Sequence, residues 1–361
     1  MNIDSNGSVD NKSVDINSAS SQSQNVSNSN IRLTYIDSLK GFLILCVVLG
    51  HILDGFMSAE IFSDRLGIMN AMYIVVYSFH MPVFFFVSGY LFGKAYIVSD
   101  CLTNKRKIIT SIGNFVAVYF VFSCLLVLVK LVFAGAVNNE QKATDILWLW
   151  RNPIGPYWYL YSLCIYYAVT RFILRRLPHT IVLIAMCIAS IVAQMMLVPE
   201  SLLCRTIFHL PFFFAGVLLI VHKLEIKLSV VLPSALVAVA IVVWGVEEQT
   251  KIHLLPLQIL TGLGMTALLW CVFARYKWLD NIVFRTCGLY CLEIYVMHCF
   301  FTGAFRSILP KLGITTFCPN LLLNLLLSAV IPIVVAYVLK QIGIHKYIFR
   351  PITALLRKRI V

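Results

Sequence analysis

The chain has 361 residues, of which 60% are hydrophobic and only 12% are charged, and its mean hydropathy is +0.86. This composition excludes an ordinary soluble domain and predicts a polytopic membrane protein. A formal net charge of +13 would indicate a nucleic-acid partner in a soluble protein, but in a membrane protein Lys and Arg mainly mark the cytosolic side. We therefore expect the lipid bilayer as a partner and no nucleic acid. The eleven cysteines show no spacing typical of a zinc site, so no metal is expected.

The chain begins with a polar segment and continues as a series of apolar runs. Residues 1–30 are rich in Ser and Asn, which predicts a disordered cytosolic tail. Residues 31–345 predict an all-α bundle of about ten transmembrane helices, and residues 346–361 a basic cytosolic tail. The expected spans are 36–57, 71–98, 108–134, 155–174, 179–198, 202–222, 228–246, 254–273, 284–305 and 320–342.

The distribution of Lys and Arg predicts the orientation of this bundle. With the N-terminus inside, 21 of the 29 Lys and Arg residues fall on the inner side and 8 on the outer side. Both termini are therefore expected in the cytosol, in a multi-pass protein of a cell membrane such as the bacterial cytoplasmic membrane. The inner cations could also attract an anionic cosubstrate such as a nucleotide phosphate.

The first expected span carries four ionisable side chains: Asp37, Lys40, His51 and Asp54. On a helix that turns about 100° per residue, all four fall within an arc of about 100° and share one face. Each costs roughly 2.5–3.5 kcal/mol at bilayer depth, so such a stripe indicates a function. Asp37 and Lys40 could instead mark the membrane boundary, but His51 lies roughly 16 Å further along the same face.

His51 is the candidate catalytic base of this stripe. Burial favours the neutral imidazole, which could accept a proton from a hydroxyl group. Asp54 lies one turn further on the same face and could orient the ring or stabilise its charged form. The alternative is a histidine with a purely structural role.

Three later motifs add candidate residues. In FHMPVFFFVSGY of the second span, Pro82 favours a kinked helix whose freed carbonyl would border a polar cavity, near His80 and Tyr90. In GPYWYL, Trp158 could form a platform for a sugar or belong to an aromatic belt at the membrane interface. In LEIYVMH, Glu293 is an intramembrane acid that we expect to bond to another helix.

These motifs together resemble the acyltransferase-3 family of integral membrane O-acyltransferases, in particular its branch similar to fucose O-acetylases. The segments that carry the resemblance are IDSLKGFLILCVVLGH, FHMPVFFFVSGYLF, PYWYL and LEIYVMH, in this order. The family's first-helix signature, a basic residue followed ten residues later by histidine, falls on Lys40 and His51. The basic residue is usually Arg in the broader family, and Lys40 lacks its bidentate fork.

The resemblance implies transfer of an acyl group, commonly acetyl from acetyl-CoA, to a hydroxyl of a carbohydrate. Acetyl-CoA or another acyl-CoA would be a cosubstrate, and no bound cofactor is expected. In this hypothesis the catalytic residues are His51 and Asp54, and the donor-binding or substrate-binding residues are Lys40, Asp37, His80, Tyr90, Trp158 and Glu293. The sequence leaves open whether the acyl group passes through a covalent carrier.

A transporter or flippase for a lipid-linked sugar is the alternative, because it would also need intramembrane charge and aromatic platforms. The segment FHLPFFFAG, which contains His209, echoes FHMPVFFFVSG at 79–89 and could mark an internal repeat. The sequence lacks paired acidic sites for a coupling ion, which favours the enzyme.

Overall fold

The computed structural model describes most of the chain between residues 33 and 358. The described ranges are 33–96, 105–133, 142–198, 201–224, 232–234, 236–237, 239–240 and 255–358. The expected tail at 1–30 lies outside them, as does most of the expected span at 228–246. The chain divides into two compact units, and the second, Tyr35–Val361, contains the cavity and helices considered below.

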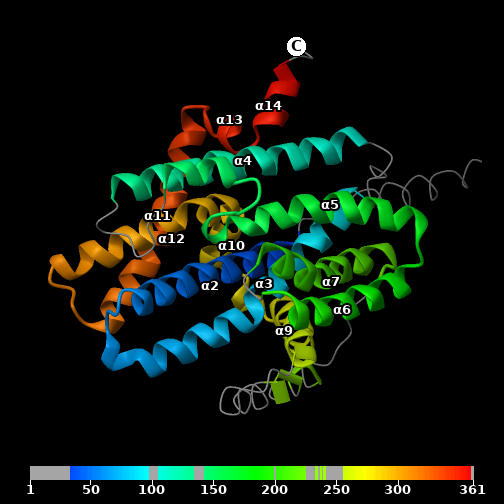
Figure 1. The fold of residues 1–361 in the computed structure, drawn as a ribbon, viewed down its shortest axis with the longest axis horizontal. Helices are drawn as coiled ribbons and strands as arrows, with labels where there is room; N and C mark the ends of the chain where they lie inside the picture. Colours follow the sequence, from blue (N-terminus) through cyan, green and yellow to red (C-terminus); the bar gives the residue numbers. More distant parts are fainter. Residues whose placement is uncertain are drawn as a thin grey trace, which may run out of the picture. The chain divides into compact units, whose positions relative to one another are not determined.

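The described part is helical, which confirms the all-α prediction (Figure 1). The long helices are α2 (Thr34–Ser58), α3 (Leu66–Tyr96), α4 (Lys105–Val132), α5 (Trp158–Arg176), α6 (His179–Met196), α7 (Leu202–Val221), α9 (Leu255–Arg275), α11 (Cys291–Lys311) and α12 (Phe317–Gln341). Shorter helices are η1 (Ser63–Arg65), η3 (Ala143–Trp148), η4 (Gly155–Tyr157), η5 (Lys277–Leu279), α10 (Ile282–Leu289), α13 (His345–Phe349) and α14 (Pro351–Lys358).

Within the described ranges, seven helices are long and apolar enough to cross a membrane, and the bent pair α10 and α11 makes up to eight. The expected count of about ten is therefore not reached there. The span expected at 155–174 does form a helix, α5, but its tyrosines and arginines make it less apolar than the seven. Large apolar side chains are exposed along α4, α6 and α12, as lipid-facing helices require.

The expected span 284–305 is not one continuous helix. Its two parts, α10 and α11, meet at an angle of 86°, and the backbone of Tyr290 between them leaves the helical region (φ −103°, ψ 22°). The cause is tight packing of α10 on α2. A Cβ added at Gly41 would collide with the carbonyl of Phe284, and one at Gly288 with the carbonyl of Asp37. Glycines allow this close backbone approach, so a tertiary contact produces the bend.

The two FH-x-P segments pack against each other. A Cβ at Gly89 of α3 would meet the carbonyl of Phe213 in α7, and a Cβ at Gly216 of α7 would meet the carbonyl of Phe86 in α3. Each helix therefore contributes a Phe-x-x-Gly element to a reciprocal contact. The echo noted in the sequence is thus a helix-packing motif, in which glycines admit the facing backbone and phenylalanines fill the surrounding space.

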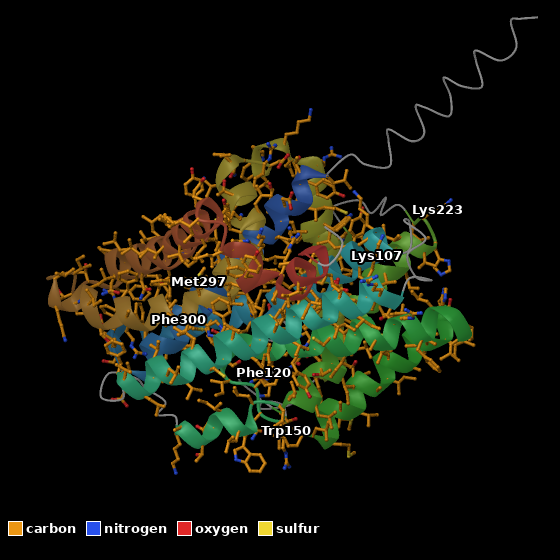
Figure 2. The ribbon with its side chains drawn as sticks, turned by 90° about the horizontal axis from the view of Figure 1, so that it is seen from above. Lys107, Phe120, Trp150, Lys223, Met297 and Phe300 are labelled. Carbon is orange, nitrogen blue, oxygen red and sulfur yellow. The ribbon has the colours of Figure 1, made fainter. Side chains whose placement is uncertain are left out.

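The start of α4 and the end of α7 lie at the same end of the bundle (Figure 2). Figure 2 shows Lys107, in the first turn of α4, and Lys223, just after α7, toward the same end. Both belong to the inner group in the predicted orientation. Phe120 and Trp150 are exposed to the surroundings of the protein.

Candidate active site

A cavity of about 1350 Å³ opens among α2, α3, α4, α5, α6, α7, α9 and α11. On α2 its lining begins at Val47 and ends at Ser58, and on α3 it begins at Tyr73 and ends at Pro82. The lining of α4 and α11 reaches the C-terminal ends of these helices, whereas that of α7 comes from its first turns. Because the helices alternate in direction, the whole cavity lies in the half of the bundle away from the start of α2. This is the outer half in the predicted orientation.

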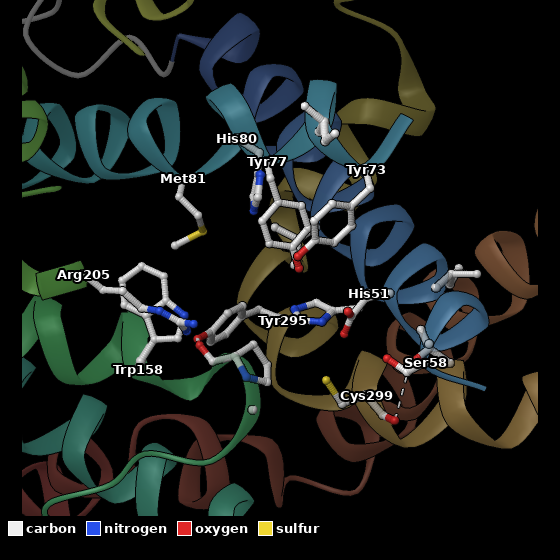
Figure 3. Close-up of a pocket in the computed structure, with 18 of the residues that line it drawn as sticks. His51, Ser58, Tyr73, Tyr77, His80, Met81, Trp158, Arg205, Tyr295 and Cys299 are labelled. Carbon is white, nitrogen blue, oxygen red and sulfur yellow. Dashed lines mark hydrogen bonds between the residues drawn. The ribbon is translucent and has the colours of Figure 1, made fainter. Parts of the chain in front are cut away.

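Four of the expected site residues line the cavity: His51, Asp54, His80 and Trp158. Figure 3 shows His51 and His80 on one side of the cavity and Trp158 across from them. Residues from three separate sequence motifs therefore lie around one space.

The other four expected site residues do not line this cavity. Lys40 pairs with Asp37 at 2.8 Å, near the opposite end of α2. Tyr90 packs its ring against Trp270 at a centroid distance of 4.8 Å. Glu293 accepts a bond from His345 Nε2 at 2.7 Å, which agrees with the expectation that it bonds to another helix.

A packed layer separates Lys40 from the cavity. Leu43 and Ile44 are fully buried and occupy the turn between Lys40 and the first lining residue, Val47. One ligand group therefore cannot contact both Lys40 and His51. The four ionisable residues of α2 therefore form two separate groups: Asp37 and Lys40 near the start of the helix, and His51 and Asp54 in the cavity.

Three histidines near the cavity have their ring orientation fixed by the backbone. His80 Nδ1 bonds to the carbonyl of Val76 at 2.7 Å, and His209 Nδ1 to that of Arg205 at 2.7 Å. His298 Nδ1 bonds to the carbonyl of Tyr295 at 2.7 Å. A carbonyl only accepts, so Nδ1 must carry the hydrogen in each ring. The neutral rings then hold a lone pair on Nε2, which can accept a proton.

The structure also brings together residues that the sequence reasoning missed. The ring of His298 lies 5.1 Å from that of His51, between centroids, and Cys299 Sγ lies 3.4 Å from His298 Nε2. One ligand atom from each of the three lies within 4.8 Å of the others, so this trio is the cluster among the described residues that could hold a metal ion. LEIYVMH was noted for Glu293, but the bend at Tyr290 that turns α11 toward His51 left no sequence signal.

The cavity is lined by more basic than acidic side chains. The basic ones are Lys130, Arg205, Arg306 and Lys311, and Asp54 is the acidic one. The guanidinium of Arg205 lies 5.6 Å from the ring centroid of Trp158, and Arg306 donates to the carbonyl of Gly55 at 3.3 Å. Tyr73 and Tyr77 stack at 4.0 Å. The aromatic side chains of this lining suit a ligand with flat or ring-shaped parts, and its basic side chains suit a ligand with negative charge.

The fold and the cavity define a multi-pass membrane protein with an internal chamber lined in part by histidines. The model of the acyltransferase-3 family, described as an acyltransferase domain, matches residues 33–340, and the chain belongs to this family. The expected resemblance is thereby confirmed.

A curated relative is the nodulation protein NolL of Sinorhizobium fredii (strain NBRC 101917 / NGR234), which is 27% identical over 195 residues. The match covers 53% of this chain and 49% of NolL, so the chain spans about half the length of this relative. No solved structure matches the chain.

Proposed function

We propose that the protein is a membrane O-acyltransferase that moves an acyl group, acetyl in the simplest case, from acyl-CoA to a hydroxyl of a cell-surface carbohydrate. The single observation that carries the proposal is that His51 of the family's first-helix signature lines a large cavity that also holds other histidine and basic side chains. The acetyl group and the carbohydrate acceptor rest on the resemblance to the fucose O-acetylase branch.

In the proposed reaction His51 takes the proton of the acceptor hydroxyl as its oxygen attacks the thioester carbonyl. Asp54 lies one turn further along α2 and lines the same cavity, which supports a role in orienting or stabilising the His51 ring. The carbon–sulfur bond of the thioester breaks, and the leaving thiolate takes the proton from His51. Negative charge that builds on the carbonyl oxygen needs a cation or a donor nearby.

Cavity cations are better suited to that charge than Lys40 or Tyr90, which do not line the cavity. The neutral His80 ring is also a poor donor, because its Nδ1 hydrogen is used by the Val76 carbonyl. Arg205 and Lys130 line the cavity and are the candidates for the oxyanion or for the phosphates of the donor. Trp158 and the stacked Tyr73 and Tyr77 are candidate sugar platforms.

The proposed route has donor and acceptor approaching from opposite sides. Asp37, Lys40 and Glu293 lie near the predicted cytosolic end, where acyl-CoA is available, and we assign them to the donor's entry. The cavity opens in the predicted outer half, where a surface carbohydrate is available. The acyl end of the donor must then pass the layer formed by Leu43 and Ile44.

A transporter or flippase for a lipid-linked sugar is the second candidate function. The observation that favours it is the reciprocal contact of the two Phe-x-x-Gly elements in α3 and α7, as a pair of related segments would make. The match to an acyltransferase family over residues 33–340 favours the enzyme.

The experiment that separates the two functions supplies labelled acetyl-CoA to membranes that contain the protein and to matched membranes without it. If the protein is an acyltransferase, label should appear in surface carbohydrate together with an equal amount of released coenzyme A. Movement of a lipid-linked sugar across the membrane without label or coenzyme A release would refute the enzyme and support the transporter.

A further inference from the structure

We propose that Cys299 is a covalent acyl carrier: its thiol takes the acyl group from the donor thioester before a hydroxyl acceptor receives it. This inference rests on the proposed function and deepens it. It is drawn from the arrangement of Cys299, His298 and His51, which the sequence reasoning did not foresee.

The first step of the argument is the pairing of a nucleophile with a base. Cys299 Sγ lies 3.4 Å from His298 Nε2, a hydrogen-bonding distance for sulfur. His298 Nδ1 donates to the carbonyls of Tyr295 at 2.7 Å and Ile294 at 3.1 Å, which leaves Nε2 free to accept the thiol proton. A nucleophile, a base and a group that orients the base are the three parts of an activated nucleophile.

The second step is access. Cys299 lines the cavity, whereas His298 is fully buried behind it and does not belong to the lining. A substrate in the cavity would therefore reach the sulfur but not the imidazole. Figure 3 shows Cys299 below His51, with Trp158 on the other side of the space.

The third step compares Cys299 with Cys204, the other described cysteine that lines the cavity. The Cys204 thiol donates to the backbone carbonyl of Ala193 at 3.6 Å and has no imidazole partner. A carbonyl cannot remove its proton, so Cys204 remains a thiol. Cys299 is thus the lining cysteine with a base at hand.

The fourth step is the position of the second base. His51 lies on the cavity side of His298, with ring centroids 5.1 Å apart, and the ligand atoms of His51, His298 and Cys299 lie within 4.8 Å of one another. An acyl group on Cys299 would therefore lie beside His51. His298 would serve the loading step and His51 the transfer to the acceptor.

The chemistry balances without a further reactant. In loading, His298 takes the thiol proton, Sγ bonds to the acyl carbon, the carbon–sulfur bond of acyl-CoA breaks, and the coenzyme A thiolate takes the proton back. In transfer, His51 takes the hydroxyl proton, the oxygen bonds to the acyl carbon, the Sγ–carbon bond breaks, and the proton passes to the Cys299 thiolate. One thioester replaces another before the ester forms.

A zinc site is the competing interpretation of the same cluster. Tetrahedral zinc with ligand distances of about 2.0–2.3 Å requires ligand atoms roughly 3.3–3.6 Å apart. The three atoms lie within 4.8 Å of one another, a looser arrangement than bound zinc holds, and the contact between Cys299 Sγ and His298 Nε2 gives the thiol a base without any ion. Zinc binding is an outcome that the experiment below detects.

The test incubates the full-length protein with labelled acetyl-CoA in the absence of acceptor, then denatures it. We expect label on the wild-type protein that neutral hydroxylamine releases and that peptide mass spectrometry locates on Cys299. The variants Cys299→Ala and His298→Ala should not retain label. His51→Ala should retain it but fail to pass it to carbohydrate, and this positive signal shows that the protein is folded.

A second readout is the exchange of labelled coenzyme A into acetyl-CoA without acceptor, which a carrier makes possible. Cys299→Ala should slow this exchange on the order of a hundredfold or more. The matched control is Cys318→Ser, because Cys318 is exposed and lies outside the cavity, and this variant should exchange like the wild type.

The outcomes separate this inference from the proposed function. Acyl transfer to carbohydrate by the wild type, with no label on Cys299 in the wild type or in His51→Ala, would overturn the carrier and leave the enzyme standing. Label on another residue, or transfer that a chelator abolishes and zinc restores without label on Cys299, would overturn it as well. Label on Cys299 without any transfer to carbohydrate would support Cys299 as the acyl carrier and refute the proposal that a carbohydrate is the acceptor.

Discussion

The contact between α10 and α2 predicts that Gly288→Ala destabilises the protein. The added methyl group would collide with the backbone carbonyl of Asp37, and a backbone carbonyl cannot turn aside as a side chain can. Overpacking costs about 1–3 kcal/mol, and the better helix propensity of Ala returns up to about 1 kcal/mol. Because the blocking atom belongs to the backbone, the upper part of the overpacking range, about 2–3 kcal/mol, applies, and we expect a net loss of about 1–2 kcal/mol in the free energy of unfolding. Because this contact sets the bend that presents α11 to His51, acyl transfer should fall as well.

The assay is thermal unfolding of the full-length protein in one detergent, with acyl transfer measured on the same samples. Gly67→Ala is the matched control, since a Cβ at this helical position meets nothing within 4 Å. The control should be as stable as the wild type or slightly more stable. Equal or greater stability of Gly288→Ala would refute the claim that the backbone contact between α2 and α10 leaves no room for a side chain at this position.

Three further predictions follow from single contacts. Glu293→Ala removes the partner of the largely buried His345 and should destabilise the protein by about 1–3 kcal/mol in thermal unfolding; an unchanged midpoint would contradict this. Tyr157→Phe removes a buried bond of 2.7 Å to the Val296 carbonyl and should cost about 1 kcal/mol in the same assay, so a stabilised variant would contradict it. Arg205→Ala removes a cavity cation that lies over Trp158, so KM for acyl-CoA or for the acceptor should rise about tenfold, with a smaller rise in Arg205→Lys; unchanged KM values for both substrates would show that Arg205 binds neither.

The sequence was sufficient to predict the helical membrane bundle, because every backbone polar group inside a bilayer must be paired within a helix or a closed barrel. It also selected His51, Asp54, His80 and Trp158, which all line the cavity. These residues stand out because charge, imidazole or a motif interrupts an apolar run, which local reading can detect.

Other features depend on contacts between distant segments. The bend at Tyr290 arises from glycines of α2 and α10, which lie far apart in the sequence, so the pattern of 284–305 gave no sign of it. His298 and Cys299 were missed for this reason. Lys40 shares a helical face with His51, but helical periodicity does not reveal the buried Leu43 and Ile44 between them.

The most direct test of the account measures acyl transfer by His51→Ala. Purified wild type, His51→Ala and the matched control His179→Ala receive labelled acetyl-CoA and a carbohydrate acceptor; His179 is half-buried, bonds to His222 and lies outside the cavity. The account predicts that His51→Ala, present at wild-type abundance, transfers acetyl on the order of 10²–10⁴ times more slowly, while the control is unchanged. Equal transfer by His51→Ala and the wild type would contradict the claim that this cavity is where the acyl group meets its acceptor.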